Sequence, residues 1–169
     1  MTLQMIVHGT PVWVWLLLAY LVSRGVKAMK GGTTPLSKLA IIPLIFAGFG
    51  LVHLAHNPHA SLFAVSAWIV GIFAGIAAGV FNATRTRFSV DMVARTVTLP
   101  GSVVPLLLIL AIFAAKFWLG FEMATVTDAA LLGTYASIDA LVSGVVAGMF
   151  AGRFITYWKA LQAHRFLHA

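Results

Sequence analysis

The chain has 169 residues, of which 61% are hydrophobic and 9% are charged, and its mean hydropathy is +0.99. Soluble domains are about a quarter charged, so this composition excludes an ordinary soluble protein and indicates that lipid covers most of the surface. The absence of cysteine excludes disulfides, thiolate metal ligands and thiol redox chemistry by the chain's own side chains. The net charge of +7 does not indicate nucleic-acid binding, because the basic residues fall almost wholly in alternate loops.

Five apolar stretches are long enough to cross a bilayer, at about 20 residues per span. We predict an all-α membrane protein, a five-helix transmembrane bundle that forms a single polytopic domain over residues 1–169. The predicted spans are residues 11–26, 39–56, 60–83, 102–121 and 129–153.

Two of these spans carry glycine at every fourth position. Residues 66–81 read SAWIVGIFAGIAAGVF, and residues 139–154 read DALVSGVVAGMFAGRF. Small residues at this spacing let helices approach closely in lipid. We therefore expect the two helices to pack together or against other helices with similarly small residues on one face. The glycines that form these two rows are Gly71, Gly75, Gly79, Gly144, Gly148 and Gly152.

The glycine pattern belongs to a longer repeat. Each glycine-rich span is preceded by a span that opens on a similar proline segment, IIPL at residues 41–44 and VVPL at residues 103–106. This arrangement predicts a duplicated helical hairpin with a pseudo-two-fold axis along the membrane normal, a feature of many transporters but also of inert scaffolds.

The connection between the third and fourth spans differs from the others. Apolar and polar residues alternate at residues 88–90 and again at residues 96–99. Such alternation is typical of strands, so we predict a short β-hairpin-like loop at the membrane surface.

The basic residues alternate between the two sides of the predicted bundle. Four of them fall in the first connection, three in the third and three in the C-terminal tail, and Lys116 lies inside the fourth span. The second and fourth connections contain no Lys or Arg. The excess of positive charge on cytoplasmic loops therefore predicts a multi-pass protein of the bacterial inner membrane, with its N-terminus outside and its C-terminus and hairpin-like loop in the cytoplasm.

The basic first connection, the segment from Arg87 to Asp91, and Pro100-Gly101-Ser102 at the start of an apolar span resemble the CcdC-like group. These are small, largely uncharacterised multi-spanning membrane proteins of bacteria. The resemblance is clearest from Arg85 to about Lys116 and implies no catalytic residues. The group takes its name from a genomic association with cytochrome c maturation, but this chain has no cysteine with which to relay thiol electrons.

Ionisable residues indicate where a site lies. Lys116 and Asp139 are predicted about 7 Å and about 12 Å deep in their spans, counted from the outer ends, so an ion pair is feasible. Charged side chains within spans usually face the bundle interior or a wet cavity. The alternatives are a Lys116 that extends to the outer interface and an Asp139 that is a hydrogen-bonded structural carboxyl. We predict a polar pocket open to the periplasm, formed by Asp139, Lys116, Tyr135 and Ser66.

A histidine cluster lies at the turn between the second and third spans. His53 and His56 share a helix face, and Pro58 ends the helix in a way that could bring His59 back toward them. Neutral imidazoles bind zinc, copper or haem iron, so a metal ion or haem site is one interpretation. The alternative is that these histidines simply contact water at the interface.

No P-loop, Gly-x-Ser-x-Gly or His-Glu-x-x-His motif is present, so no enzyme class is indicated. The leading hypothesis is a small transporter, a channel-like protein or a ligand-binding membrane protein. The second is a structural or assembly protein that binds a membrane partner, or another copy of itself, through the glycine faces. The third is a metal- or haem-binding membrane protein.

Overall fold

In the computed structural model, residues 11–56, 61–91 and 93–167 are described. Within these ranges there are five helices, each long and apolar enough to cross a membrane, which confirms the predicted number of long apolar helices. They are α2 (Val12–Met29), α3 (Leu36–His56), α4 (Leu62–Arg85), α5 (Val104–Thr125) and α6 (Ala129–Leu167).

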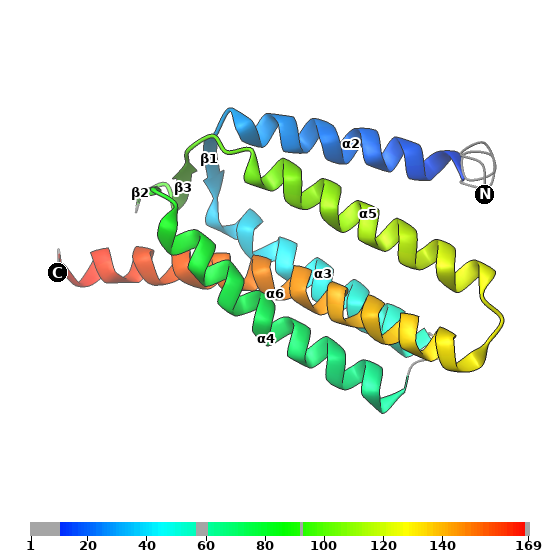
Figure 1. Ribbon diagram of the computed structural model, residues 1–169. Coiled ribbons are helices and arrows are strands. Elements are labelled where there is room, and N and C mark those ends of the chain that lie inside the picture. Colours follow the sequence, from blue (N-terminus) through cyan, green and yellow to red (C-terminus); the bar gives the residue numbers. More distant parts are fainter. Residues whose placement is uncertain (1–10, 57–60, 92, 168–169) are drawn as a thin grey trace.

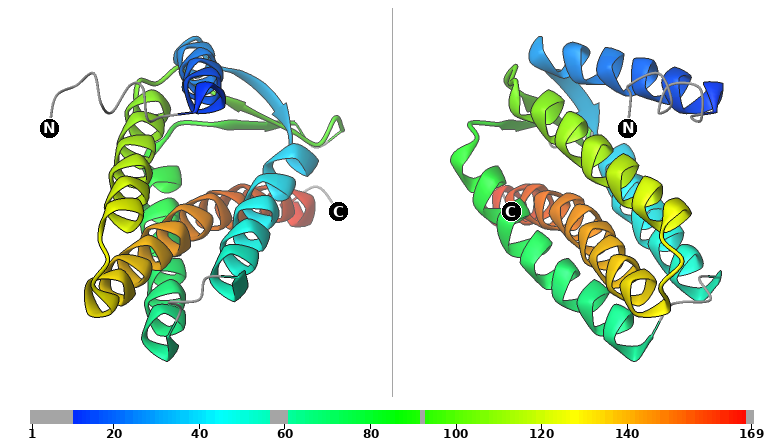
Figure 2. Two further views of the ribbon diagram at one scale, coloured as in Figure 1. Left: turned by 90° about the vertical axis from the view of Figure 1, so that its right-hand side faces the viewer. Right: turned by 45° about the vertical axis from the view of Figure 1, so that its right-hand side comes forward.

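The helices form two groups. Helices α2 and α5 lie side by side, and α3, α4 and α6 form the second group (Figure 1). Helix α4 packs most extensively on α6, α3 also packs on α6, and α5 makes a smaller contact with α6 that joins the groups. Figure 2 shows α6 running between α3 and α4, which makes it the central helix of the second group.

The structure places the two glycine rows against each other along parallel helices α4 and α6. A Cβ added to any of the six glycines would collide with a carbonyl oxygen of the opposite helix. The backbones can therefore be this close only because these positions lack side chains. The oxygens facing Gly71, Gly75, Gly79, Gly144, Gly148 and Gly152 belong to Leu141, Val145, Met149, Trp68, Ile72 and Ile76, respectively.

A small antiparallel sheet lies at one end of the helices. Its strands are β1 (Gly32–Pro35), β2 (Ser89–Asp91) and β3 (Thr96–Leu99), in the order β1-β3-β2. Strands β2 and β3 confirm the predicted hairpin, but β1 was not predicted. Strand β1 reads GTTP and lacks an apolar alternation, so its strand character depends on pairing with β3, a segment remote in the sequence.

The sheet packs on a compact apolar core. Leu36, Ala83, Val97 and Tyr157 are buried there, and they come from α3, α4, β3 and α6. The Phe88 ring meets the Tyr157 ring edge-on at 4.9 Å between centroids. Aromatic pairs prefer this geometry, so the core holds the sheet-side ends of three helices together.

Helices α5 and α6 extend beyond the C-terminal ends of the predicted spans. Helix α5 ends at Thr125 rather than residue 121, because the segment Glu122–Thr125 continues the helical hydrogen bonding and the Thr125 hydroxyl donates to the Phe121 carbonyl at 3.0 Å. Helix α6 has 39 residues and spans about 58 Å at 1.5 Å per residue. A bilayer core is about 30 Å thick, so α6 extends well beyond one bilayer thickness.

Replacing Gly31 with alanine is expected to lower the free energy of unfolding by about 1–3 kcal/mol. Gly31 has φ +69°, and an added Cβ would lie 2.7 Å from both the Gly101 nitrogen and the Leu99 oxygen. Thermal unfolding in detergent measures the effect. The matched control is Gly48→Ala in α3, where a Cβ meets nothing within 4 Å and where alanine favours the helix. Equal stability of the two variants would contradict the prediction.

Candidate functional site

Lys116 of α5 reaches across to α6 and binds two residues there. Its Nζ donates to Asp139 Oδ1 at 2.6 Å, to Ser143 Oγ at 2.5 Å and to the Asp139 carbonyl at 3.3 Å. The Ser143 hydroxyl in turn donates to the Asp139 carbonyl at 2.8 Å. An ammonium group has three donors, and here each one has an acceptor. We refer to these three residues as the Lys116–Asp139–Ser143 network.

Helix geometry explains why these residues meet. Asp139 and Ser143 are four residues apart, so they lie on the same face of α6. Lys116 lies nine residues before the end of α5, and Asp139 lies ten residues after the start of α6. At 1.5 Å per residue, Lys116 and Asp139 lie about 14 Å and about 15 Å from the α5–α6 connection, and Lys116 is deeper than predicted because α5 is longer.

The network is charged but is surrounded by apolar helices. The side chain of Asp139 is 10% exposed, and that of Lys116 is 36% exposed. Taking two charges out of water is costly, and direct pairing offsets much of that cost. Lys116 pairs with Asp139 of α6, so its side chain does not extend alone to the outer interface.

The structure does not bring Tyr135 and Ser66 into this network. Tyr135 packs edge-on against Trp118 at 6.1 Å between ring centroids, and its hydroxyl faces the Glu122 carboxyl. Ser66 is exposed on α4, and its hydroxyl donates to the Leu62 carbonyl of the same helix at 2.9 Å. The predicted set of four residues therefore reduces to Lys116 and Asp139, with Ser143 added.

The histidine cluster is described only in part. The His56 ring Nδ1 lies 2.9 Å from the Val52 carbonyl oxygen of its own helix. The side chain of His53 and the whole of His59 lie outside the described residues. Among the residues that are described, no group of three His, Cys, Asp or Glu side chains could hold a metal ion.

Sequence reasoning missed Ser143 and Trp68. The signal for Ser143 was its i+4 spacing from Asp139. Trp68 Nε1 is buried and has no hydrogen-bond partner in the described part of the chain. A Cβ on Gly50 would lie 2.8 Å from Trp68 Nε1 and 3.8 Å from Ser143 Cβ, so the indole and Ser143 border the same small space. An unsatisfied buried donor therefore lies beside the network.

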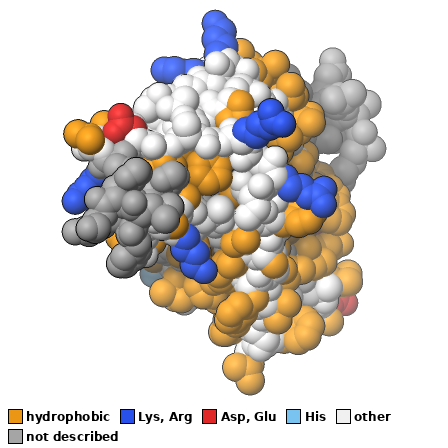
Figure 3. Space-filling model, turned by 90° about the vertical axis from the view of Figure 1, so that its left-hand side faces the viewer, with side chains coloured by type: hydrophobic (Ala, Val, Ile, Leu, Met, Phe, Trp, Pro, Cys, Tyr) orange, Lys and Arg blue, Asp and Glu red, His pale blue; other side chains and the backbone are white. Residues whose placement is uncertain are grey.

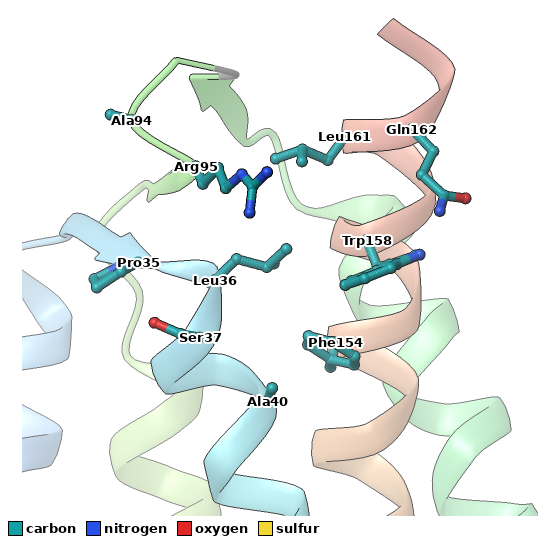
Figure 4. Close-up of a pocket in the computed structure, with 10 residues that line it drawn as sticks. All are labelled: Pro35, Leu36, Ser37, Ala40, Ala94, Arg95, Phe154, Trp158, Leu161 and Gln162. Carbon is teal, nitrogen blue, oxygen red and sulfur yellow. The ribbon is translucent and has the colours of Figure 1, made fainter. Parts of the chain in front are cut away.

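A cavity of about 730 Å³ lies elsewhere, at the end that carries the sheet. Lys and Arg side chains surround this end of the molecule (Figure 3). None of Lys116, Asp139, Tyr135 and Ser66 lines this cavity. Its lining residues are Pro35, Leu36, Ser37, Ala40, Ala94, Arg95, Phe154, Trp158, Leu161 and Gln162 (Figure 4).

Comparison with known proteins places this architecture in a family. The family of unknown function DUF6622 matches residues 1–163, which is nearly the whole chain and includes all three residues of the network. The chain belongs to this family. The DUF6622 protein described here is also similar to the uncharacterized protein PM0739 of Pasteurella multocida (strain Pm70). The two are 35% identical over 92 residues, which cover 51% of this chain and 71% of the relative. No solved structure matches this DUF6622 protein.

Proposed function

We propose that the chain is an integral protein of the bacterial inner membrane, with its N-terminus outside and its C-terminus in the cytoplasm. Five long apolar helices support the membrane location. The Lys and Arg side chains around the sheet end support the orientation, because positively charged loops stay in the cytoplasm (Figure 3). In this orientation the three-stranded sheet faces the cytoplasm.

Within that membrane, we infer that the protein is a small transporter, a channel-like protein or a ligand-binding protein that acts through the Lys116–Asp139–Ser143 network. One observation carries this proposal: Lys116 and Asp139 form an ion pair at 2.6 Å more than two helical turns inside two apolar helices. Charged residues at such depth are costly and mark ion pathways, proton relays or ligand sites in membrane proteins. The nearby unpaired Trp68 N–H offers a further donor to a ligand.

The network lies between the two helix groups, and this position suggests how binding at the site could move one group relative to the other. The contact of α5 with α6 is much smaller than that of α4 with α6, and the ion pair lies within this smaller contact between the two groups. A proton on Asp139, or a ligand acceptor that binds Lys116, would replace the ion pair. The α2–α5 group could then move relative to α6. Binding of a proton or ligand at the network would in this way change the relative position of the two helix groups.

Proton flux tests this proposal. The purified protein is reconstituted in liposomes that contain a pH-sensitive dye, and a potassium diffusion potential drives proton entry. Asp139→Asn is expected to reduce the flux to that of empty liposomes, because an amide neither carries a proton nor pairs with Lys116 as a carboxylate does. The control is Asp128→Asn, which removes a carboxylate that caps α6 through the Ala130 nitrogen at 2.8 Å and lies outside the network. Unchanged flux in a folded Asp139→Asn variant would contradict the proposal.

The structure also bears on the other hypotheses. The glycine rows of α4 and α6 already cover each other, so a partner or a second copy could use them only if these helices separated. An assembly role would therefore rest on another surface, such as the sheet. A metal or haem site at His53, His56 and His59, and the resemblance to the CcdC-like group, remain predictions.

A further inference from the structure

The cavity at the sheet end lies between two helices and a strand connection. Leu36, Ser37 and Ala40 contribute from α3, and Phe154 and Trp158 from α6. Arg95, which precedes β3, lies over the space between these helices (Figure 4). Cavities of about 300–1,000 Å³ are of the size that holds small molecules, and this one has about 730 Å³.

Arg95 is held in place by its backbone. It has φ +49°, an uncommon conformation for a residue other than glycine. Its carbonyl accepts a hydrogen bond from the Leu36 nitrogen at 3.0 Å, and Asp91 Oδ1 accepts from the Val93 and Ala94 nitrogens at 2.9 Å. The strand connection and the start of α3 therefore fix where the Arg95 side chain begins.

The Arg95 guanidinium is available to a ligand. In Figure 4 it points into the cavity, between Leu36 and Leu161. Within the described residues it makes no hydrogen bond or ion pair, and no acidic residue lines the cavity. A guanidinium presents up to five N–H donors in a planar fork that matches a phosphate group. The cavity therefore combines one unpaired cation with mostly apolar walls.

We propose that this cavity binds an anionic phospholipid, with the phosphate at Arg95 and the upper part of an acyl chain along Ala40 and Phe154. The apolar walls favour a lipid over a soluble anion. Trp158 and Leu161 belong to the apolar segment of α6, near the end where tryptophan marks a membrane interface. Basic pockets between membrane helices on the cytoplasmic side suit anionic headgroups. The inference rests on the membrane location in the proposed function but not on transport.

Quenching of Trp158 by brominated lipids tests the inference. The full chain is reconstituted in phosphatidylcholine vesicles in which either brominated phosphatidylglycerol or brominated phosphatidylcholine replaces a rising share of the lipid. The difference between the parent and Trp158→Phe isolates the Trp158 signal. The site is expected to bind phosphatidylglycerol with about fivefold higher affinity than phosphatidylcholine. This ratio corresponds to the attraction that one basic residue near the membrane surface exerts on an anionic lipid. Arg95→Gln is expected to remove this preference.

Two further variants separate the cavity from a general basic surface. Lys159→Gln removes an exposed charge beside Trp158 that does not line the cavity, so it should leave most of the preference intact. Ala40→Leu fills the cavity without changing charge, so it should reduce quenching by both lipids. Size-exclusion chromatography shows whether each variant is folded.

Each contrary outcome has a separate meaning. If Arg95→Gln and Lys159→Gln had the same preference for phosphatidylglycerol over phosphatidylcholine, the lipid site would be wrong. The preference of the parent would then come from a diffuse basic surface. Relief of the phosphatidylglycerol quenching by millimolar inorganic phosphate would overturn it in favour of a soluble anion. An absence of quenching by either lipid would instead contradict the membrane location itself. The proton flux of Asp139→Asn tests the proposed transport separately, so its result does not depend on any of these three outcomes.

Discussion

Replacing Gly148 with leucine is expected to disrupt the packing of α4 on α6. Even a single Cβ at this position would collide with the Ile72 carbonyl oxygen and would lie 2.9 Å from the Ile76 nitrogen. Both contacts are with helical backbone, which cannot move aside as a flexible side chain does. We expect the free energy of unfolding to fall by about 3 kcal/mol or more, at the upper end of the effect of overpacking. Thermal unfolding of the detergent-solubilised protein measures this loss. Size-exclusion chromatography of the same samples shows whether the variant aggregates.

A glycine elsewhere on α6 provides the control for this variant. Gly133 lies on the same helix, and a Cβ there would meet nothing within 4 Å. Gly133→Leu is therefore expected to be tolerated, although it adds the same side chain. If Gly148→Leu were as stable as Gly133→Leu, the close α4–α6 contact would be wrong. Stability that depended on protein concentration would instead indicate that the glycine rows pack between two copies of the chain.

Removing one member of the Lys116–Asp139 pair is expected to destabilise the protein more than removing both. Asp139→Leu leaves an ammonium group inside the apolar bundle, at a cost of about 2.5–3.5 kcal/mol for an unpaired lysine at the centre of a membrane helix. Lys116→Met leaves a carboxyl group in the same position, though that group can take up a proton. The double variant leaves no charge, so we expect a coupling energy of about 1–3 kcal/mol between the two sites.

The double-mutant cycle is measured from thermal unfolding of the parent, both single variants and the double variant. A second cycle with Lys159→Met and Asp128→Asn serves as control, because these residues lie on α6 and its N-terminal cap and do not contact each other. That cycle is expected to be additive within about 0.5 kcal/mol. Additive losses at Lys116 and Asp139 would show that the ion pair does not stabilise the fold.

Local patterns were sufficient to predict the helices and several of their contacts. Apolar runs predicted five long helices, because a run of about 20 apolar residues requires no information from elsewhere in the chain. The four-residue glycine spacing pointed to a close pair of helices, and the structure places those two rows together. The depths of Lys116 and Asp139 made a pair feasible. The error in the depth of Lys116 came from the end of α5, since the segment with the polar residues Glu122 and Thr125 resembles the start of a loop yet continues the helix.

Features that depend on distant segments could not be predicted in the same way. Strand β1 has too few residues and no apolar alternation, and it becomes a strand only through pairing with β3. The cavity combines side chains from α3, the strand connection and α6, three segments far apart in the sequence. Arg95 was counted only as one of several loop charges, because its backbone conformation depends on the turn capped by Asp91. Ser143 was hidden inside a stretch read for its glycines.

The separation of β1 from β3 also sets an order of events during synthesis. Thr33 and Thr98, whose hydroxyl oxygens lie 2.8 Å apart in the finished sheet, are 65 residues apart in the chain. At about 5–20 residues per second, the ribosome completes this interval in roughly 3–13 s. During that time α3 and α4 are synthesised, while the first connection still has no strand partner. In the proposed membrane location, the first three helices would therefore enter the bilayer and hold their orientation by charge and hydrophobicity, and the sheet would join the two connections only afterwards.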